Sequence, residues 1–115
     1  MYNNIVNYAY YFKYDVDNMN SKTYGSFIWD IEKENANIEK YKVDFITACK
    51  AFNDKNRIIA VDEKHSEAEQ RYFCIGKVNS RIVTVRFIKR GQRIRIFGAG
   101  YWRKGVNLYE KTNKQ

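Results

Sequence analysis

A single histidine in an acidic segment is the first candidate for chemistry in this chain. A histidine side chain has an ordinary pKa near neutrality, so His65 has the residue type that takes or gives protons under physiological conditions. Glu67 and Glu69 follow closely and are alternative bases, although acidic side chains in such a segment are also typical of a solvated loop. A lone histidine in a charged loop is equally compatible with a plain surface residue. The segment therefore suggests proton transfer without establishing it.

Arginine side chains form the second candidate group. A guanidinium group is planar and presents a fork of N–H donors that fits phosphate oxygens. The alternative is that the arginines pair with acidic side chains, but Glu110 is the one acid in residues 77–115. We therefore expect at least two of the group to bind an anion. The four candidates are Arg71, Arg86, Arg93 and Arg95.

The positive charge of the chain is concentrated in its last third. The net charge is +8, and residues 77–115 hold 11 of the 21 Lys and Arg side chains, whereas residues 1–76 are nearly neutral. A charge run can be only a solvated face, but this segregation favours a surface for a polyanion such as nucleic acid. Tyr101 lies in the basic region and is a candidate to stack on an unpaired base. Trp102 could also stack on a base, but its helical spacing is more typical of a core residue, so Tyr101 is the better candidate.

Length and composition exclude several classes of protein. A chain of 115 residues with 44% hydrophobic residues has room for one domain. It contains no apolar run near the roughly 18 residues of a membrane span and no N-terminal secretory signal, so we expect a cytoplasmic protein without a membrane partner. Cys49, Cys74 and His65 cannot make a zinc finger, and no carboxylate or His/Cys cluster has metal-ligand spacing. We therefore expect no metal and no other cofactor.

The pattern between residues 27 and 53 predicts a strand followed by two helices. The strand covers residues 27–29, and Asp30 is placed to cap a helix over residues 31–40. Asp44 is placed to cap the second helix. One apolar stripe at helical spacing runs along that second helix. Its members are Phe45, Ala48, Cys49 and Phe52.

From residue 57 the hydrophobic period changes from that of a helix to that of a strand. Strands are predicted over residues 57–61, 71–79, 81–89 and 92–98, and the last three are joined by two-residue connections that force an antiparallel meander. A short closing helix carries Trp102, Val106 and Tyr109 on one face. The prediction is an α+β domain over residues 25–115, with an antiparallel sheet of about four strands and helices on one face. Residues 1–24 are predicted to be an N-terminal extension that carries an aromatic cluster, Tyr8–Tyr14.

Five short motifs follow one another along the chain: Phe27-x-Trp29-Asp30-x-x-Lys33-x-x-x-Asn37-x-x-Lys40, Val43-Asp44-Phe45, Asp62-x-x-His65-Ser66-x-x-Glu69-x-Arg71-Tyr72-x-x-x-Gly76, Arg90-Gly91-x-x-Ile94-Arg95-Ile96, and Leu108-Tyr109-Glu110. This ordered set resembles the BrnT family, the ribonuclease toxins of type II toxin–antitoxin operons, which have a RelE-like fold. The chain has Tyr41-Lys42 where the family usually has His-Gly, and Gly98-Ala99-Gly100 where it usually has Ser-Ala-Arg.

The resemblance implies a metal-independent endoribonuclease that attacks RNA through its 2′-hydroxyl and inhibits translation and growth. Such a reaction needs a base, an acid and cations that stabilise the phosphorane. The implied catalytic residues are His65, Glu67 and Arg71. The implied RNA- and phosphate-binding residues are Arg86, Arg93, Arg95, Tyr101, Arg103 and Lys104, with Arg103 taking over a cationic role in the variant ending.

The resemblance also implies a protein partner. That partner is a BrnA-like antitoxin with a ribbon-helix-helix domain, and contact with operator DNA is made only through the toxin–antitoxin complex. The alternative function is a non-catalytic module on the same fold that binds nucleic acid or docks the antitoxin. His65 together with Glu67 discriminates between the two, because a module that only binds has no use for either.

Overall fold

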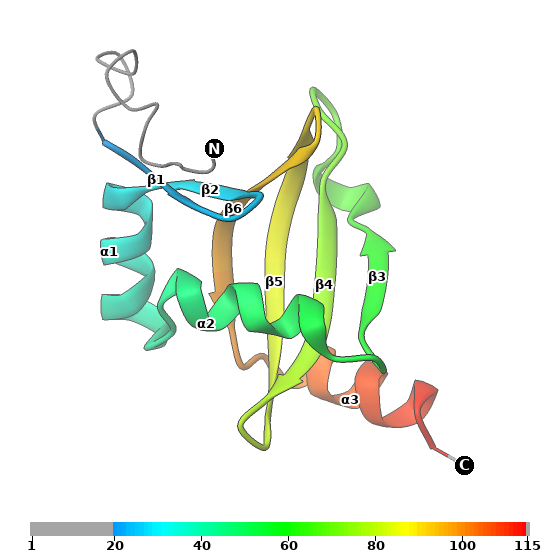
Figure 1. Ribbon diagram of the computed structural model, residues 1–115. Helices are drawn as coiled ribbons and strands as arrows, with labels where there is room; N and C mark the ends of the chain where they lie inside the picture. The colour runs from blue at the N-terminus through cyan, green and yellow to red at the C-terminus, as the bar shows by residue number, and fades with distance from the viewer. Residues whose placement is uncertain (1–19, 115) are drawn as a thin grey trace.

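The computed structural model describes residues 20–114, which form an α+β fold of six strands and three α-helices (Figure 1). The predicted cluster Tyr8–Tyr14 lies outside the described residues. No helix between residues 20 and 114 is long and apolar enough to cross a membrane. In chain order the elements are β1 (Ser21–Tyr24), β2 (Phe27–Asp30), α1 (Ile31–Tyr41), α2 (Phe45–Lys50), the 3-10 turn η2 (Ala51–Asn53), β3 (Ile58–Val61), the 3-10 turn η3 (Glu63–His65), β4 (Tyr72–Val78), β5 (Arg81–Arg90), β6 (Arg93–Gly100) and α3 (Arg103–Thr112).

The sheet is larger than predicted and is mixed. Its strand order is β1-β2-β6-β5-β4-β3, and β2 runs parallel to β6 while every other pair is antiparallel. The prediction of about four antiparallel strands is therefore wrong. A four-residue strand such as β1 has little sequence signal of its own, and it forms because Gly25, with φ +62°, turns the chain back onto β2. The residues 21–24, which were predicted as extension, thus lie in the sheet.

The first two helices begin where the sequence predicts. The Asp30 carboxylate accepts the backbone N–H groups of Glu32 and Lys33, and Asp44 accepts that of Thr47. The buried side chain of Asn37 then fastens α1 to β6, because its amide bonds both the N–H and the carbonyl of Ala99. This part of the family pattern is structural.

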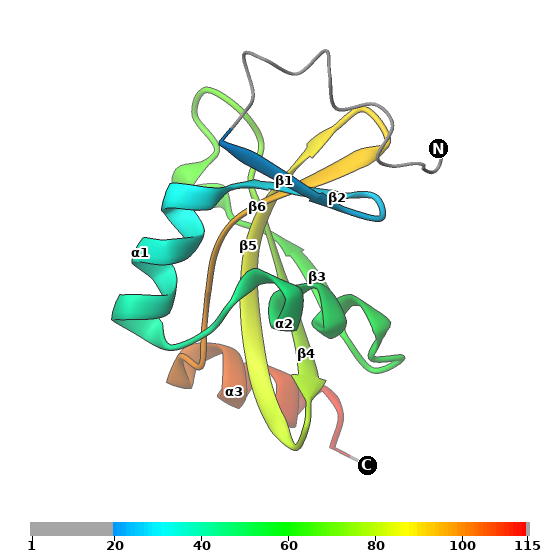
Figure 2. The same ribbon diagram turned by 60° about the vertical axis from the view of Figure 1, so that its left-hand side comes forward.

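Helices cover both faces of the sheet, whereas one covered face was predicted. The main core lies under α1 and α2, and α3 packs at one end of the opposite face (Figures 1 and 2). The prediction was wrong because the chain leaves β6 at Gly100 and crosses to the face of the sheet opposite α1 and α2 before α3 begins. Gly105 allows the close approach of α3 to β5, since a Cβ there would collide with the Thr84 hydroxyl. A second, smaller hydrophobic cluster lies between α3 and the sheet. It contains the buried residues Ile75, Ile82 and Tyr109, and Val106 packs against them.

Both cysteines belong to the core, as predicted for Cys49. Cys49 and Cys74 are buried free thiols. Burial raises the pKa of each thiol to about 12, so neither is a nucleophile near neutrality. The reactive groups must be sought elsewhere.

Candidate active site

The largest concentration of candidate residues surrounds a hollow of about 530 Å³ on the face of the sheet that α3 partly covers. We call it the His65 hollow. Strands β4 and β5 form its floor, the loop after β3 forms one wall, and the first two turns of α3 form the other. The lining residues are Asp62, His65, Phe73, Ile75, Thr84, Arg86, Trp102, Lys104, Gly105 and Leu108.

The loop wall is built around a contact between an aspartate and the histidine. Asp62 Oδ2 lies 3.0 Å from His65 Nδ1, with the carboxylate buried at 7% exposure and the imidazole half exposed at 51%. The backbone of the loop is fixed independently. Asp62 donates its N–H to the Arg71 carbonyl at 2.7 Å, and Ser66 Oγ accepts the Arg71 N–H at 2.9 Å. The His65 ring therefore lines the hollow from a loop whose backbone is held by hydrogen bonds to Arg71.

Two of the predicted arginines converge on one aromatic ring beside the hollow. The guanidinium carbons of Arg71 and Arg86 lie 4.9 and 5.2 Å from the centre of the Phe97 ring. Alternation along β6 places Phe97 on this face, because its neighbour Ile96 points into the main core, and the β-bulge that follows brings Gly98 opposite Arg86. Arg86 lines the hollow, and Arg71 lies beside it on the shared ring.

The α3 wall contributes a cation and an indole. Lys104 and Trp102 both line the hollow, and the indole lies over Gly100 and edge-on to Tyr41, 5.0 Å between ring centres. Tyr101 instead packs against the main core on the other face, with the Arg81 guanidinium 3.4 Å from its ring centre. The aromatic surface at the hollow is therefore that of Trp102 and Phe73.

The remaining predicted residues lie outside the hollow. Glu67 and Arg103 are exposed, and neither lines it. Glu69 forms an exposed ion pair with Arg90, 3.2 Å apart. Arg93 pairs with Arg90 across the β5–β6 turn. Arg90 is four residues from Arg86, which is about 13 Å along β5. Arg95 is half-buried, opposite Ile88.

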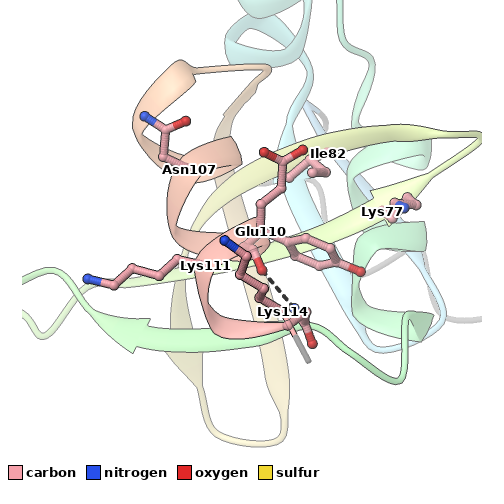
Figure 3. Close-up of a pocket in the computed structure, with 8 residues that line it drawn as sticks. Lys77, Ile82, Asn107, Glu110, Lys111 and Lys114 are labelled. Carbon is pink, nitrogen blue, oxygen red and sulfur yellow. Dashed lines mark hydrogen bonds between the residues drawn. The ribbon is translucent and has the colours of Figure 1, made fainter.

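A second hollow, of about 610 Å³, lies on the other flank of α3 (Figure 3). We call it the Lys77 hollow, and Lys111 and Lys114 also line it. Tyr109, which also lines this hollow, donates its hydroxyl to Asp54 Oδ2 at 2.5 Å, and the same oxygen accepts the Lys77 N–H at 2.7 Å. Burial, followed by the bond to Asp54, raises the pKa of Tyr109 to about 12. This arrangement fastens α3 to the sheet.

Some site residues were missed from sequence. Asp62 stands three residues before His65, a spacing that places both at one turn and could have been used. Phe97 was also missed, although alternation from Ile94 and Ile96 on the core side places it on the arginine face. No group of three or more His, Cys, Asp or Glu side chains within residues 20–114 is arranged to hold a metal ion.

A comparison with protein-family models identifies the family of this chain. The model described as the ribonuclease toxin, BrnT, of type II toxin–antitoxin system matches residues 29–105, which is more than half of the chain. The matched region contains every residue of the His65 hollow except Leu108, but only Lys77 and Ile82 of the Lys77 hollow. No individually curated protein matches the sequence.

Proposed function

We propose, from the premise that this chain belongs to the BrnT family of ribonuclease toxins of type II toxin–antitoxin systems, that it cleaves RNA in the His65 hollow without a metal ion. The observation that carries the proposal is the composition of this one hollow. A histidine held by a buried carboxylate faces a guanidinium group and an ammonium group across a space of about 530 Å³. These are the groups that metal-free attack by a 2′-hydroxyl requires.

The proposed reaction begins with a proton transfer to His65. Its Nε2 takes the proton of a 2′-hydroxyl, and the 2′-oxygen attacks the adjacent phosphorus. Arg86 and Lys104 neutralise the dianionic phosphorane. Arg71, whose guanidinium group lies over the Phe97 ring, adds further positive charge. The bond from phosphorus to the 5′-oxygen then breaks as that oxygen takes a proton, which leaves a 2′,3′-cyclic phosphate and a 5′-hydroxyl.

The proton for the leaving oxygen has two candidate donors. Lys104 lines the hollow on the wall opposite His65. Glu67, which we predicted from sequence, is exposed on the His65 loop and does not line the hollow. We favour Lys104 for this reason, and Glu67 stays a prediction that a Glu67→Gln variant tests.

RNA is expected to enter across aromatic and basic surfaces. Trp102 and Phe73 offer ring faces at the hollow on which unpaired bases can stack. Arg95 and Arg93 continue the positive charge along β6, and Arg103 adds to it beside Lys104. These side chains are proposed to bind phosphates on either side of the cleaved bond.

The proposed protein partner is a BrnA-like antitoxin with a ribbon-helix-helix domain. A ribonuclease toxin of a type II system has a cognate antitoxin. The half-exposed imidazole and the exposed Lys104 are open to solvent, so a protein that covers this side of α3 would exclude RNA. Contact with operator DNA is proposed only through that complex. The non-catalytic alternative is set aside, because the family is one of ribonucleases.

The test is a cleavage assay with the purified full-length protein and a single-stranded RNA in the presence of a chelator. We expect cleavage, with 2′,3′-cyclic phosphate and 5′-hydroxyl ends identified by mass spectrometry. The matched control is the same sequence with deoxyribose throughout, which should stay intact because the nucleophile is missing. Cleavage of the deoxy substrate, or activity that disappears with chelator and returns with magnesium, would reject the mechanism.

A further inference from the structure

We propose that Asp62 is a positioning residue for this reaction. Its carboxylate holds the neutral imidazole of His65 with the proton on Nδ1 and leaves Nε2 free to accept a proton in the hollow. The inference rests on the proposed function of the His65 hollow. Its basis is the 3.0 Å contact between Asp62 Oδ2 and His65 Nδ1. Because a carboxylate can only accept, the ring nitrogen that bonds it must carry the proton.

The other three aspartates among residues 20–114 show what Asp62 does differently. Asp30 and Asp44 cap helices by accepting backbone N–H groups, and Asp54 accepts the backbone N–H groups of Asn56 and Lys77. Asp62 precedes η3 in the position of a cap, yet its side chain makes no capping hydrogen bond. Its carboxylate is directed at the imidazole instead.

The loop does not need this carboxylate to keep its shape. The Asp62 backbone N–H bonds the Arg71 carbonyl, and the Asp62 carbonyl accepts the Ser66 hydroxyl at 2.6 Å. A buried carboxylate is unfavourable unless it is paired. The side chain of Asp62 is 7% exposed and its one ion-pair partner among the described residues is His65. The burial of this carboxylate therefore costs free energy, and we attribute its presence to the orientation of the His65 ring.

The cations of the hollow leave this pair intact. Arg86 from β5 and Lys104 from α3 are the other charged side chains that line the hollow. Neither forms an ion pair with Asp62 in the part of the chain that the structure describes. The carboxylate is therefore available to the imidazole, while the two cations remain available to a phosphate.

The direct test is the tautomer of the imidazole in the wild-type protein. The chain has one histidine, so the side-chain nitrogen signals in a long-range ¹H–¹⁵N spectrum belong to His65 alone. In the neutral ring we expect the proton on Nδ1, whereas free histidine favours Nε2. Asp62→Asn should shift the ring toward the Nε2–H form, because an amide can donate to Nδ1. A wild-type ring protonated on Nε2 would overturn the proposal.

Kinetics separate this inference from the proposed function. Asp62→Asn should lower kcat by about tenfold or more with little change in KM, and the double variant Asp62→Asn/His65→Ala should be no slower than His65→Ala. Ser66→Ala is the matched control, since it loosens the same loop without touching the ring, and it should keep the proton on Nδ1. If His65→Ala cleaves at the wild-type rate, the proposed function fails. If His65→Ala is slow and Asp62→Asn slows it further by its full factor, the positioning role fails.

Discussion

The two flanks of α3 carry hollows of similar size, about 530 and 610 Å³, that differ in chemistry. Both are lined by lysine side chains. The His65 hollow also holds a histidine on a buried carboxylate, an arginine and two aromatic rings. Beside the Lys77 hollow the carboxylate of Asp54 is occupied with the Tyr109 hydroxyl and backbone amides, and no histidine is present.

Positive charge by itself does not distinguish the two hollows. The basic last third of the chain supplies both hollows. Lysines alone attract a polyanion from a distance. Cleavage also requires a group that exchanges protons at the place where the phosphate is held. Of the two hollows, the His65 hollow has a histidine beside its cations, whereas the Lys77 hollow has the carboxylate of Glu110 and no histidine.

The largest effect is expected from removing the proton carrier. His65→Ala should slow RNA cleavage by about 10²- to 10⁴-fold, the usual contribution of general acid–base catalysis. The variant leaves the buried Asp62 carboxylate without its ion-pair partner among the described residues and should be less stable, so its rate is measured at a temperature where its thermal transition shows that it is folded. The measurements are single-turnover rates and a thermal transition. A folded variant that retains the wild-type rate would remove the distinction between the two flanks.

A smaller effect, on stability rather than rate, is expected beside the Lys77 hollow. Tyr109→Phe removes the bond to Asp54 and should lower the free energy of unfolding by about 1–3 kcal/mol. At temperatures where the variant is folded, cleavage should continue at the wild-type rate. Urea titrations and cleavage assays measure the two quantities. A catalytic loss with unchanged stability would give the Lys77 hollow a role in the reaction.

The same contact sets an acid dependence of stability. Burial raises the pKa of Asp54, but bonds from Tyr109 and from the backbone of Lys77 and Asn56 outweigh burial and lower the pKa below 3.8. Charged Asp54 therefore contributes stability above its unfolded pKa, and this contribution is lost as the pH falls through the lower folded value. Tyr109→Phe should lose less stability than the wild type over that acidic range.

The smallest effect is expected from arginines that only bind. Arg93→Ala/Arg95→Ala should weaken RNA binding and reduce the slope of log affinity against log salt by about two, one for each lost phosphate contact. The matched control is Lys111→Ala/Lys114→Ala, which removes two charges at the Lys77 hollow and should change the slope less. Binding isotherms at several salt concentrations measure both. An unchanged slope in the arginine variant would mean that Arg93 and Arg95 bind no phosphate and that RNA contacts the protein only at the His65 hollow.

The local elements were predictable because their signals are local. Asp30 and Asp44 were identified as caps from residue type and spacing, and the two-residue connections identified the meander β4-β5-β6. The parallel pairing of β2 with β6 joins segments far apart in sequence, and no local pattern indicates it. The position of α3 was missed for a similar reason, since it depends on a close approach at Gly105.

The site was predictable in its residue types but not in its grouping. His65, Arg86 and Lys104 were all named from the sequence, and the structure brings them to one hollow. Of the two aromatic candidates, Tyr101 was favoured over Trp102, but Tyr101 packs against the main core and Trp102 lines the hollow. These two residues connect β6 to α3, so their positions depend on how α3 packs on the sheet, which no local pattern indicates.

Two lysines on the same helix test the central claim most directly. Lys104 lines the His65 hollow and Lys111 lines the Lys77 hollow, seven residues apart on α3, and both are exposed. The measurement is the single-turnover rate of RNA cleavage by Lys104→Ala and by Lys111→Ala at saturating protein. We predict a loss of about tenfold or more for Lys104→Ala, because a cation at the reacting phosphate is missing, and a nearly wild-type rate for Lys111→Ala. Equal losses, or a greater loss for Lys111→Ala, would contradict the assignment of the reaction to the His65 hollow.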